Sequence, residues 1–343
     1  GERYVHFDEQ SILLFDGACG TTIQQLDLPA SAWGEKEGCN EYLNLTAPDA
    51  IIGVHDAFLE AGAQVLETNT FGASAIVLAE YGLEHRVGEI NRAAVANARR
   101  AIGTRTDRWV AGSVGPGTKL PSLGHIDPAA LAAAYREQIR ALTEAGVDLL
   151  ILETCQDILQ VRTALVACFE TLESLGRDLP VMVSVTIEQM GTMLVGTDIA
   201  AAVAAIAPFP VFSLGLNCAT GPADMESHLR YLHHHWPERI SCIPNQGLPE
   251  VVDGKTTYPL QPDGFAHVMT RFVETLGVRI VGGCCGTTPE HIAALRSALD
   301  TCPPPPREKP EPVPAVASLY QAVELSQDIP PLIIGERANA NGS

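Results

Sequence analysis

The sequence has few basic residues. Its 343 residues include 22 Lys and Arg against 41 Asp and Glu, which gives a formal net charge of −19 at pH 7. A surface that binds nucleic acid needs concentrated positive charge to displace counterions from the phosphates. The charge balance therefore argues against a nucleic acid as a partner.

Long apolar runs are also absent. Hydrophobic residues make up 46% of the chain and charged residues 18%, but the apolar residues occur in short stretches. None approaches the roughly 20 residues that span a bilayer. The first residues show neither the basic start nor the apolar centre of a secretory signal peptide. These absences predict a globular, cytoplasmic protein that is not inserted in a membrane.

The cysteines lack the pattern of a disulfide scaffold. Their number, nine, is odd, and their spacing does not match that of small disulfide-rich domains. This usage fits a reducing compartment, in which thiols stay free. Their roles are therefore expected in packing, catalysis or metal binding.

Two adjacent cysteines follow a predicted strand in the segment Val278–Glu290. A β-rich run leads into glycines, then Cys284 and Cys285, and then a helix start of the form Thr-Pro-Glu. The pair has three interpretations: two buried small residues, a strained disulfide between neighbours, or two metal ligands. Thiolates favour zinc, but two ligands do not hold it, so the metal interpretation requires a third cysteine at an equivalent strand end.

Eight short β-rich runs recur along the chain, each followed by a helical pattern. Most runs are continuously apolar, as expected for strands covered on both faces. Eight such units in about 290 residues predict a closed (β/α)8 TIM barrel with its site at the C-terminal ends of the strands, and a doubly wound open sheet is the alternative. The predicted strands are Ile12–Asp16, Gln64–Thr68, Trp109–Ser113, Leu149–Glu153, Val181–Thr186, Val211–Leu216, Arg239–Pro244 and Arg279–Gly282. The predicted helices cover residues 48–63, 84–103, 128–146, 157–176, 198–207, 223–236, 262–277 and 289–300.

The third cysteine follows the sixth predicted strand. Cys218 has the same context as Cys284: an apolar strand, a glycine, the thiol and a turn of small residues. Asn245 follows the seventh strand, between them in sequence, and is expected to face the same space. Cys218, Cys284 and Cys285 would leave a fourth zinc position open, which is the pattern of a catalytic rather than a structural zinc site.

Other candidate ligands fit less well. Cys19, Cys39 and Cys155 lie closer to the predicted rim than the remaining cysteines, and any one could supply a fourth sulfur. The run 233–235 contains three histidines, but consecutive helical residues point in different directions. We interpret that run as a solvated helix end.

Three thiolates suit zinc to a particular chemistry. They make it a poor Lewis acid for activating water, but they let it hold a fourth sulfur as the thiolate, a nucleophile for alkyl transfer. The Gly-rich turn Gly17–Thr22 can present backbone N–H groups to a carboxylate, and Glu153, at the end of the fourth strand, can pair with an ammonium. The pattern therefore suggests an amino-acid thiol as substrate.

These segments resemble the homocysteine S-methyltransferase family over about Ile12–Ala298. The resemblance is carried by FDGA and GT at 15–18 and 20–21, ETNTFG at 67–72, ET at 153–154, GLNC at 215–218, PN at 244–245 with Gly247, and GGCCG at 282–286. It implies a zinc enzyme that methylates homocysteine, with Cys218, Cys284 and Cys285 as the metal ligands. It also implies these substrate contacts: Asp16 and Glu153 at the amino group, Gly17, Ala18 and Cys19 at the carboxylate, and Asn245 at the substrate or as a fourth metal ligand without substrate.

The C-terminal part has a different character. Residues 1–302 would form the barrel and the proline-rich residues 303–330 a linker, within which Leu319–Leu325 could pack back as a short element. Residues 331–343 look like the first strand and loop of a further domain, truncated here. Ile334–Asn339 resembles the opening motif of the folate-binding domain in cobalamin-dependent methionine synthases. The resemblance implies methyl transfer from methylcobalamin to give methionine, with the cobalamin-binding and folate-binding domains of the same protein as partners.

Three other functions remain open from the sequence. The barrel could belong to a free-standing homocysteine methyltransferase that uses betaine, S-methylmethionine or S-adenosylmethionine. Zinc could instead be purely structural, with four fixed ligands in a binding module. A thiol redox protein could use Cys284 and Cys285 without a metal.

Overall fold

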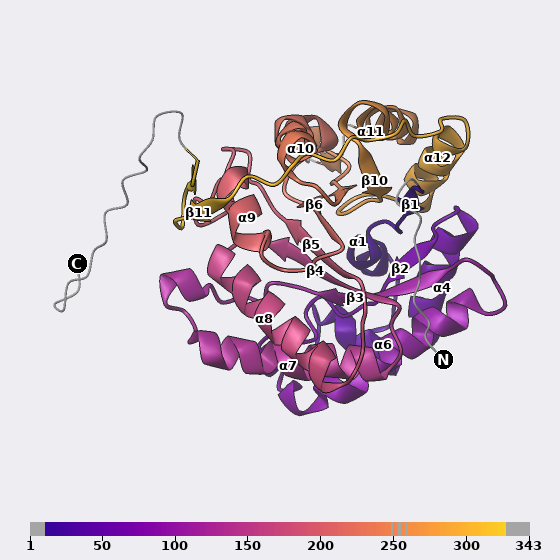
Figure 1. Cartoon of the computed structure of the whole chain (residues 1–343). Coiled ribbons are helices and arrows are strands. Elements are labelled where there is room, and N and C mark those ends of the chain that lie inside the picture. Colours follow the sequence, from indigo (N-terminus) through magenta and orange to yellow (C-terminus); the bar gives the residue numbers. More distant parts are fainter. Residues whose placement is uncertain (1–10, 248–249, 253–254, 258–259, 327–343) are drawn as a thin grey trace, which may run out of the picture.

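The computed structural model describes residues 11–247, 250–252, 255–257 and 260–326. The barrel strands are β1 (Leu13–Leu14), β2 (Val65–Glu67), β3 (Trp109–Val114), β4 (Leu149–Cys155), β5 (Val181–Val185), β6 (Ser213–Asn217), β7 (Arg239–Ile243) and β10 (Val278–Val281). They form one parallel sheet in the order β1–β10–β7–β6–β5–β4–β3–β2. A parallel bridge between Phe15 and Val65 joins β1 to β2 and closes the ring. The predicted (β/α)8 barrel is confirmed, and helices surround it (Figure 1).

Eight long helices follow the strands at the predicted positions. They are α4 (Pro48–Glu60), α6 (Val87–Ile102), α7 (Pro128–Glu144), α8 (Ile158–Ser174), α9 (Ile199–Ile206), α10 (Pro222–His235), α11 (Pro262–Leu276) and α12 (Pro289–Asp300). Side-chain oxygens of Asp127, Asp157 and Asp198 accept backbone N–H groups at the starts of α7, α8 and α9. Thr288 and His291 form a capping box at the start of α12. Among the described residues, no helix combines the length and apolar character needed to cross a membrane.

The core has two layers, because successive strand residues point to opposite faces. Leu149 and Ile151 belong to the apolar cluster that fills the barrel interior. Leu150 and Leu152 belong to the larger cluster between the strands and the helices. Strands buried on both faces account for the continuous apolar runs in the sequence.

Several shorter elements complete the fold. Between β1 and α4 lie α1 (Cys19–Gln24), α2 (Ala30–Trp33), η1 (Asn40–Tyr42) and α3 (Leu43–Thr46). Before α6 and α7 lie α5 (Ala75–Leu78), η2 (Ala79–Tyr81), η3 (Glu84–Arg86) and η4 (Pro121–Leu123). Two antiparallel hairpins pair β8 (Glu250–Val252) with β9 (Lys255–Thr257) and β11 (Ala315–Ala317) with β12 (Ala322–Glu324).

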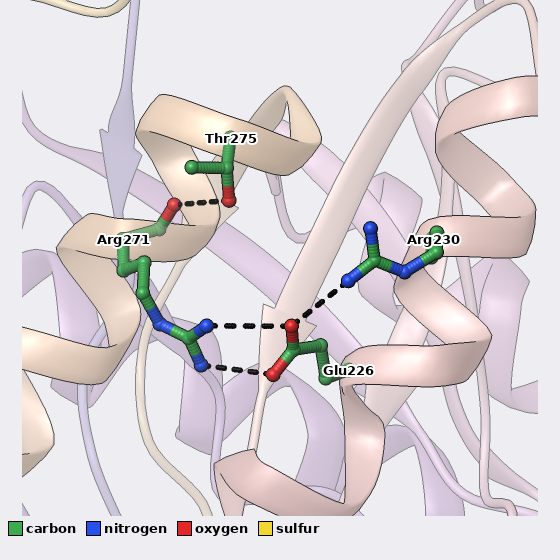
Figure 2. A network of polar contacts seen from close by, with 4 residues as sticks. All are labelled: Glu226, Arg230, Arg271 and Thr275. Atoms are coloured by element: carbon green, nitrogen blue, oxygen red, sulfur yellow. Dashed lines mark hydrogen bonds and ion pairs between the residues drawn. The ribbon is translucent and has the colours of Figure 1, made fainter.

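A polar network joins the two helices that flank β7. The carboxylate of Glu226 on α10 accepts hydrogen bonds from the Arg271 guanidinium on α11 at 3.3 and 2.9 Å, and from Arg230 at 3.0 Å (Figure 2). Thr275 lies one turn further along α11, and its hydroxyl donates back to the Arg271 carbonyl at 2.8 Å. Because α10 follows β6 and α11 precedes β10, the network ties together the helices next to the cysteine-bearing strands.

The segment predicted as a linker runs along the outside of the barrel past α10 and α11 and reaches β11 beside α9 (Figure 1). Arg279 of β10 donates to the Pro305 carbonyl, and Arg307 donates to the carbonyls of Leu232, His233, Trp236 and Glu238 at the end of α10. Strand β12 lies within the stretch expected to pack back. The predicted opening of a further domain, 331–343, lies outside the described residues, and the domain boundaries stay a prediction.

Candidate active site

The three predicted zinc ligands lie together. The Sγ atoms of Cys218, Cys284 and Cys285 are all within 4.8 Å of one another, and those of Cys218 and Cys285 are 4.0 Å apart. Tetrahedral zinc with Zn–S bonds of about 2.3 Å separates its sulfurs by roughly 3.8 Å, so the cluster fits this ion with small adjustments. Within the described ranges, these are the Cys, His, Asp and Glu residues whose geometry could hold a metal.

Backbone hydrogen bonds connect the strand ends that carry these cysteines. The Cys218 N–H donates to Ile243 O at 3.2 Å, and the Cys284 N–H donates to Pro244 O at 2.8 Å. The Gln246 N–H donates to Cys285 O at 3.1 Å. The turn after β7 is thus the bridge that fixes the turn after β6 relative to the turn after β10.

Backbone strain is concentrated at Cys218. Cys218 and Ala219 have φ angles of 59° and 57°, in the left-handed region that residues with a Cβ rarely adopt. Thr154, which follows Glu153 on β4, has φ 56°. Such conformations persist only where surrounding contacts over-determine them, and they cluster at functional sites.

Asn217 supplies those contacts. Its Oδ1 accepts hydrogen bonds from the Thr154 N–H at 3.0 Å and the Ser184 hydroxyl at 2.6 Å, and its Nδ2 donates to Thr154 Oγ1 at 2.8 Å. One buried amide therefore links β4, β5 and β6 directly beside Glu153 and Cys218. This positioning role was not predicted from the sequence, although Asn217 stands at a strand end where an apolar residue would be expected.

The turn that carries Cys284 and Cys285 is held by Thr287. The Thr287 hydroxyl donates to Cys284 O at 2.7 Å, and the Thr287 N–H donates to the same carbonyl at 3.1 Å. A Cβ at Gly283 would lie 2.2 Å from Thr287 Oγ1, so this turn requires glycine. The Ala18 N–H donates to Thr287 Oγ1 at 3.1 Å, which joins the cysteine turn to the turn after β1.

In the chain, Asn245 lies between Pro244 and Gln246, whose backbones form hydrogen bonds with Cys284 and Cys285. It is 9% exposed, and its Oδ1 is buried without a hydrogen-bond partner. Unpaired buried oxygens are rare because each costs free energy unless a ligand occupies it. This acceptor is therefore available to a ligand, and a contact of Asn245 with metal or substrate stays a prediction.

Three carboxyl groups converge on the same rim, from β1, β2 and β4. Asp16 and Glu153 are buried, at 2% and 7% exposure. Asp16 Oδ2 accepts the Glu67 N–H at 3.1 Å, Glu153 accepts the Ser113 hydroxyl, and the carboxyls of Glu67 and Glu153 lie within hydrogen-bond reach of each other. Glu67 was not among the predicted contacts, although the polar run at the end of its strand was a signal.

Burial makes this cluster reluctant to ionise fully. It raises the pKa of Glu153 to about 7, and the charge of Cys218 adds to the effect. Burial, together with the charge of Glu153, also raises the pKa values of Asp16 and Glu67 well above the usual range. No Lys or Arg of the described ranges forms an ion pair with any of the three. The cluster therefore suits an external cation such as an ammonium.

The turn after β1 is only partly available for an anion. The Ala18 N–H is already bound to Thr287, whereas α1 begins at Cys19 without a side-chain cap on its first N–H groups. A Cβ at Gly17 would lie 2.7 Å from the ring of Phe58, which explains the glycine there.

Two further groups of predicted candidates lie apart from the metal cluster. Cys19, Cys39 and Cys155 are not part of the three-sulfur group, and burial raises the pKa of each thiol, so they favour the protonated form. The histidines at 233–235 form the last turn of α10, at a partly exposed helix end as expected.

Comparison with known proteins agrees with this arrangement. The model of the homocysteine S-methyltransferase family matches residues 13–299. The chain belongs to this family. It is therefore a methyltransferase module built on the (β/α)8 barrel.

Two relatives are methionine synthases from mycobacteria. The protein named methionine synthase from Mycobacterium tuberculosis is 43% identical over 338 residues, and that from Mycobacterium leprae is 42% identical over 342 residues. Each alignment covers 97% of this chain but only 28% of the relative. The chain thus spans little more than a quarter of the length of these proteins.

Solved structures of the family share the fold. The metallated form of the homocysteine methyltransferase MmuM from Escherichia coli is similar, with a TM-score of 0.67 and 28% identity. The match covers 84% of this chain and 97% of that one. The apo form of the same protein gives a TM-score of 0.62 with 26% identity.

Proposed function

We propose that this chain binds homocysteine, activates its sulfur as a thiolate and transfers a methyl group to it, giving methionine. The observation that carries the proposal is the juxtaposition of a three-cysteine cluster and a three-carboxyl cluster on one barrel rim. A thiol amino acid matches both, with sulfur for the first and ammonium for the second. The family membership and the names of the relatives support the same substrate.

Cys218, Cys284 and Cys285 would hold zinc, and Asn245 would complete its shell in the absence of substrate. Zinc bound there would supply the positive charge that keeps the substrate sulfur deprotonated near neutral pH. The sulfur spacing and the unpaired Asn245 Oδ1 fit this ion.

The chain's own groups orient the substrate. The ammonium of homocysteine would lie among Asp16, Glu67 and Glu153, where it would offset the cost of the buried carboxylates. Its carboxylate would meet the N–H groups at the start of α1, because Ala18 is already engaged by Thr287. Both contacts together would orient the substrate with its sulfur toward the cysteines.

We propose methylcobalamin as the methyl donor, carried by a domain outside this sequence. Methylcobalamin would supply an electrophilic methyl group: the homocysteine thiolate would form the S–CH3 bond as the carbon–cobalt bond breaks, and the electron pair of that bond would stay on the corrinoid. The relatives named methionine synthase extend far beyond the matched region, which leaves room for cobalamin-binding and folate-binding domains.

X-ray absorption at the zinc edge, with and without homocysteine, tests the site. We expect three sulfurs and one light ligand without substrate and four sulfurs with it. Four sulfurs in both samples would refute an open, catalytic position. The C284S variant should lose more than about 100-fold in zinc affinity, whereas C302S, just after α12, should bind zinc like the parent protein.

A second candidate is a free-standing enzyme with a sulfonium donor or betaine. The similarity to MmuM, of which the match covers 97%, favours it. Methylation of homocysteine by supplied methylcobalamin, S-methylmethionine, S-adenosylmethionine and betaine separates the two. Turnover with one of the latter three and none with methylcobalamin would overturn our choice of donor.

A further inference from the structure

The β11–β12 hairpin carries a concentration of exposed apolar side chains. This hairpin patch consists of Val313, Val316, Tyr320, Val323 and Leu325. Val316 and Val323 are direct cross-strand partners, so their side chains share one face, and they are 55% and 58% exposed. Clustered exposed apolar residues usually mark an interaction surface.

The hairpin is held against the barrel by its turn, which fixes where the patch faces. The Asp198 N–H at the start of α9 donates to Tyr320 O at 3.0 Å, and the Thr197 hydroxyl donates to Leu319 O. Gly196, with φ 94°, permits this approach, since a Cβ there would lie 3.1 Å from the Tyr320 ring. The Ser318 hydroxyl accepts the N–H of Gln321 at 3.1 Å and stabilises the turn.

This docking leaves the opposite face uncovered. Two-stranded hairpins are marginally stable in water unless a further surface packs on them. The barrel contacts both strands of the hairpin through α9, but Val316 and Val323 stay more than half exposed. A second surface is therefore expected over these two side chains.

We propose that the hairpin patch is the docking surface for the next domain of the same polypeptide, the domain predicted to open at residue 331. Residues 326–330 follow the hairpin, and the six residue steps from Leu325 to residue 331 span at most about 22 Å. A domain that opens at residue 331 would then start within this reach of Leu325. The relatives, of which the chain covers 28%, have the length to supply it. The proposal rests on the multidomain architecture put forward under the proposed function.

Hydrogen exchange on the full-length polypeptide tests this proposal. We expect the amides of residues 313–325 to exchange about tenfold or more slowly in the full-length protein than in the 343-residue chain. The full-length double variant V316K/V323K should regain fast exchange and become susceptible to proteases within residues 326–330. Val166, 42% exposed on α8, provides the matched control V166K, which should change neither result.

Two outcomes would overturn the proposal. Equal exchange of the hairpin in the two proteins would mean that no domain covers it. A dimer of the 343-residue chain that dissociates on V316K/V323K substitution would assign the patch to a second copy.

A methylation assay distinguishes failure of this docking proposal from failure of the proposed function on which it rests. The V316K/V323K chain should methylate homocysteine from supplied methylcobalamin at the parental rate, because the patch is no part of the active site. Absence of methylation in the parent chain would refute the function and leave the exchange result intact.

Discussion

At the scale of single residues, the burial of Glu153 makes the stability of the fold depend on pH. The folded-state pKa of Glu153 is raised to about 7 by burial, against an ordinary value of 4.5. Between these values the folded chain holds a proton that the unfolded chain has lost. The contribution of Glu153 to stability is therefore fully present below about pH 4.5 and is lost as the pH rises through 7.

The variant E153Q should remove this pH dependence. From pH 4 to pH 8, the unfolding free energy of the parent should fall by on the order of 3 kcal/mol because of Glu153, and that of E153Q should not show this fall. Urea unfolding of the zinc-free proteins at both values measures the difference. E137Q, at an exposed position on α7, serves as the control, and parallel curves for E153Q and E137Q would contradict the assignment.

Glu67 should contribute to recognition of the substrate amino group. The E67Q variant is expected to weaken homocysteine binding by about 10–100-fold, because a charged partner of the ammonium is lost. Binding of 4-mercaptobutyrate, which lacks the amino group, should change less than about threefold. Calorimetric titration measures the affinity of E67Q for both thiols. Equal losses of affinity for the two thiols would indicate a general distortion of the site instead.

Among the site residues, local signals revealed the metal ligands best. Cys218 and Cys284 could be identified because each follows an apolar strand and a glycine, a pattern contained in a few consecutive residues. The hydrogen bond of the Ala18 N–H could not be predicted from the sequence, because its acceptor, Thr287, lies 269 residues away. Glu67 was visible as a polar strand end, but its proximity to Glu153 depends on barrel closure.

At the scale of elements, the apolar runs and helix caps predicted every barrel strand and its following helix. The elements between β1 and α4 escaped prediction because α2 and α3 are only four residues long, too short to show a helical period. The β11–β12 hairpin was not predicted as such because the prolines that precede it favour an extended linker. Its position beside α9 is set by contacts of the Tyr320 carbonyl, which no sequence pattern announces.

Strand spacing at β6 and β7 should be highly sensitive to side-chain volume. A Cβ at Gly215 would lie 1.9 Å from Ser241 Oγ and 2.0 Å from Ser241 O, so G215A should cost about 3 kcal/mol or more and displace the Cys218 turn. Gly53, within α4, has nothing within 4 Å of such an atom, and G53A should stabilise by about 0.5–1 kcal/mol. Chemical denaturation and zinc content measure both, and similar stabilities of the two variants would contradict the packing argument.

At the scale of the whole molecule, Arg307 fastens the linker to the barrel. Its guanidinium donates to carbonyls at the end of α10, where a positive charge also opposes the negative end of the helix dipole. The R307A variant should lose about 2 kcal/mol and expose residues 303–314 to proteolysis. R136A, which breaks a surface pair with Glu170, should change stability by less than about 0.5 kcal/mol. An R307A linker as protease-resistant as that of the parent would show that other contacts hold it.

The hydrogen bond from Ala18 to Thr287 also has a consequence for synthesis on the ribosome. Its partners are 269 positions apart, so the first strand emerges long before the cysteine turn that completes its pairing. At about 5–20 residues per second, the nascent chain waits roughly 15–50 s with its β1 edge unpaired, and Cys218 waits roughly 3–14 s of this time. A cell that makes this protein must keep the waiting thiols reduced and shield the open barrel from aggregation until translation has passed α12.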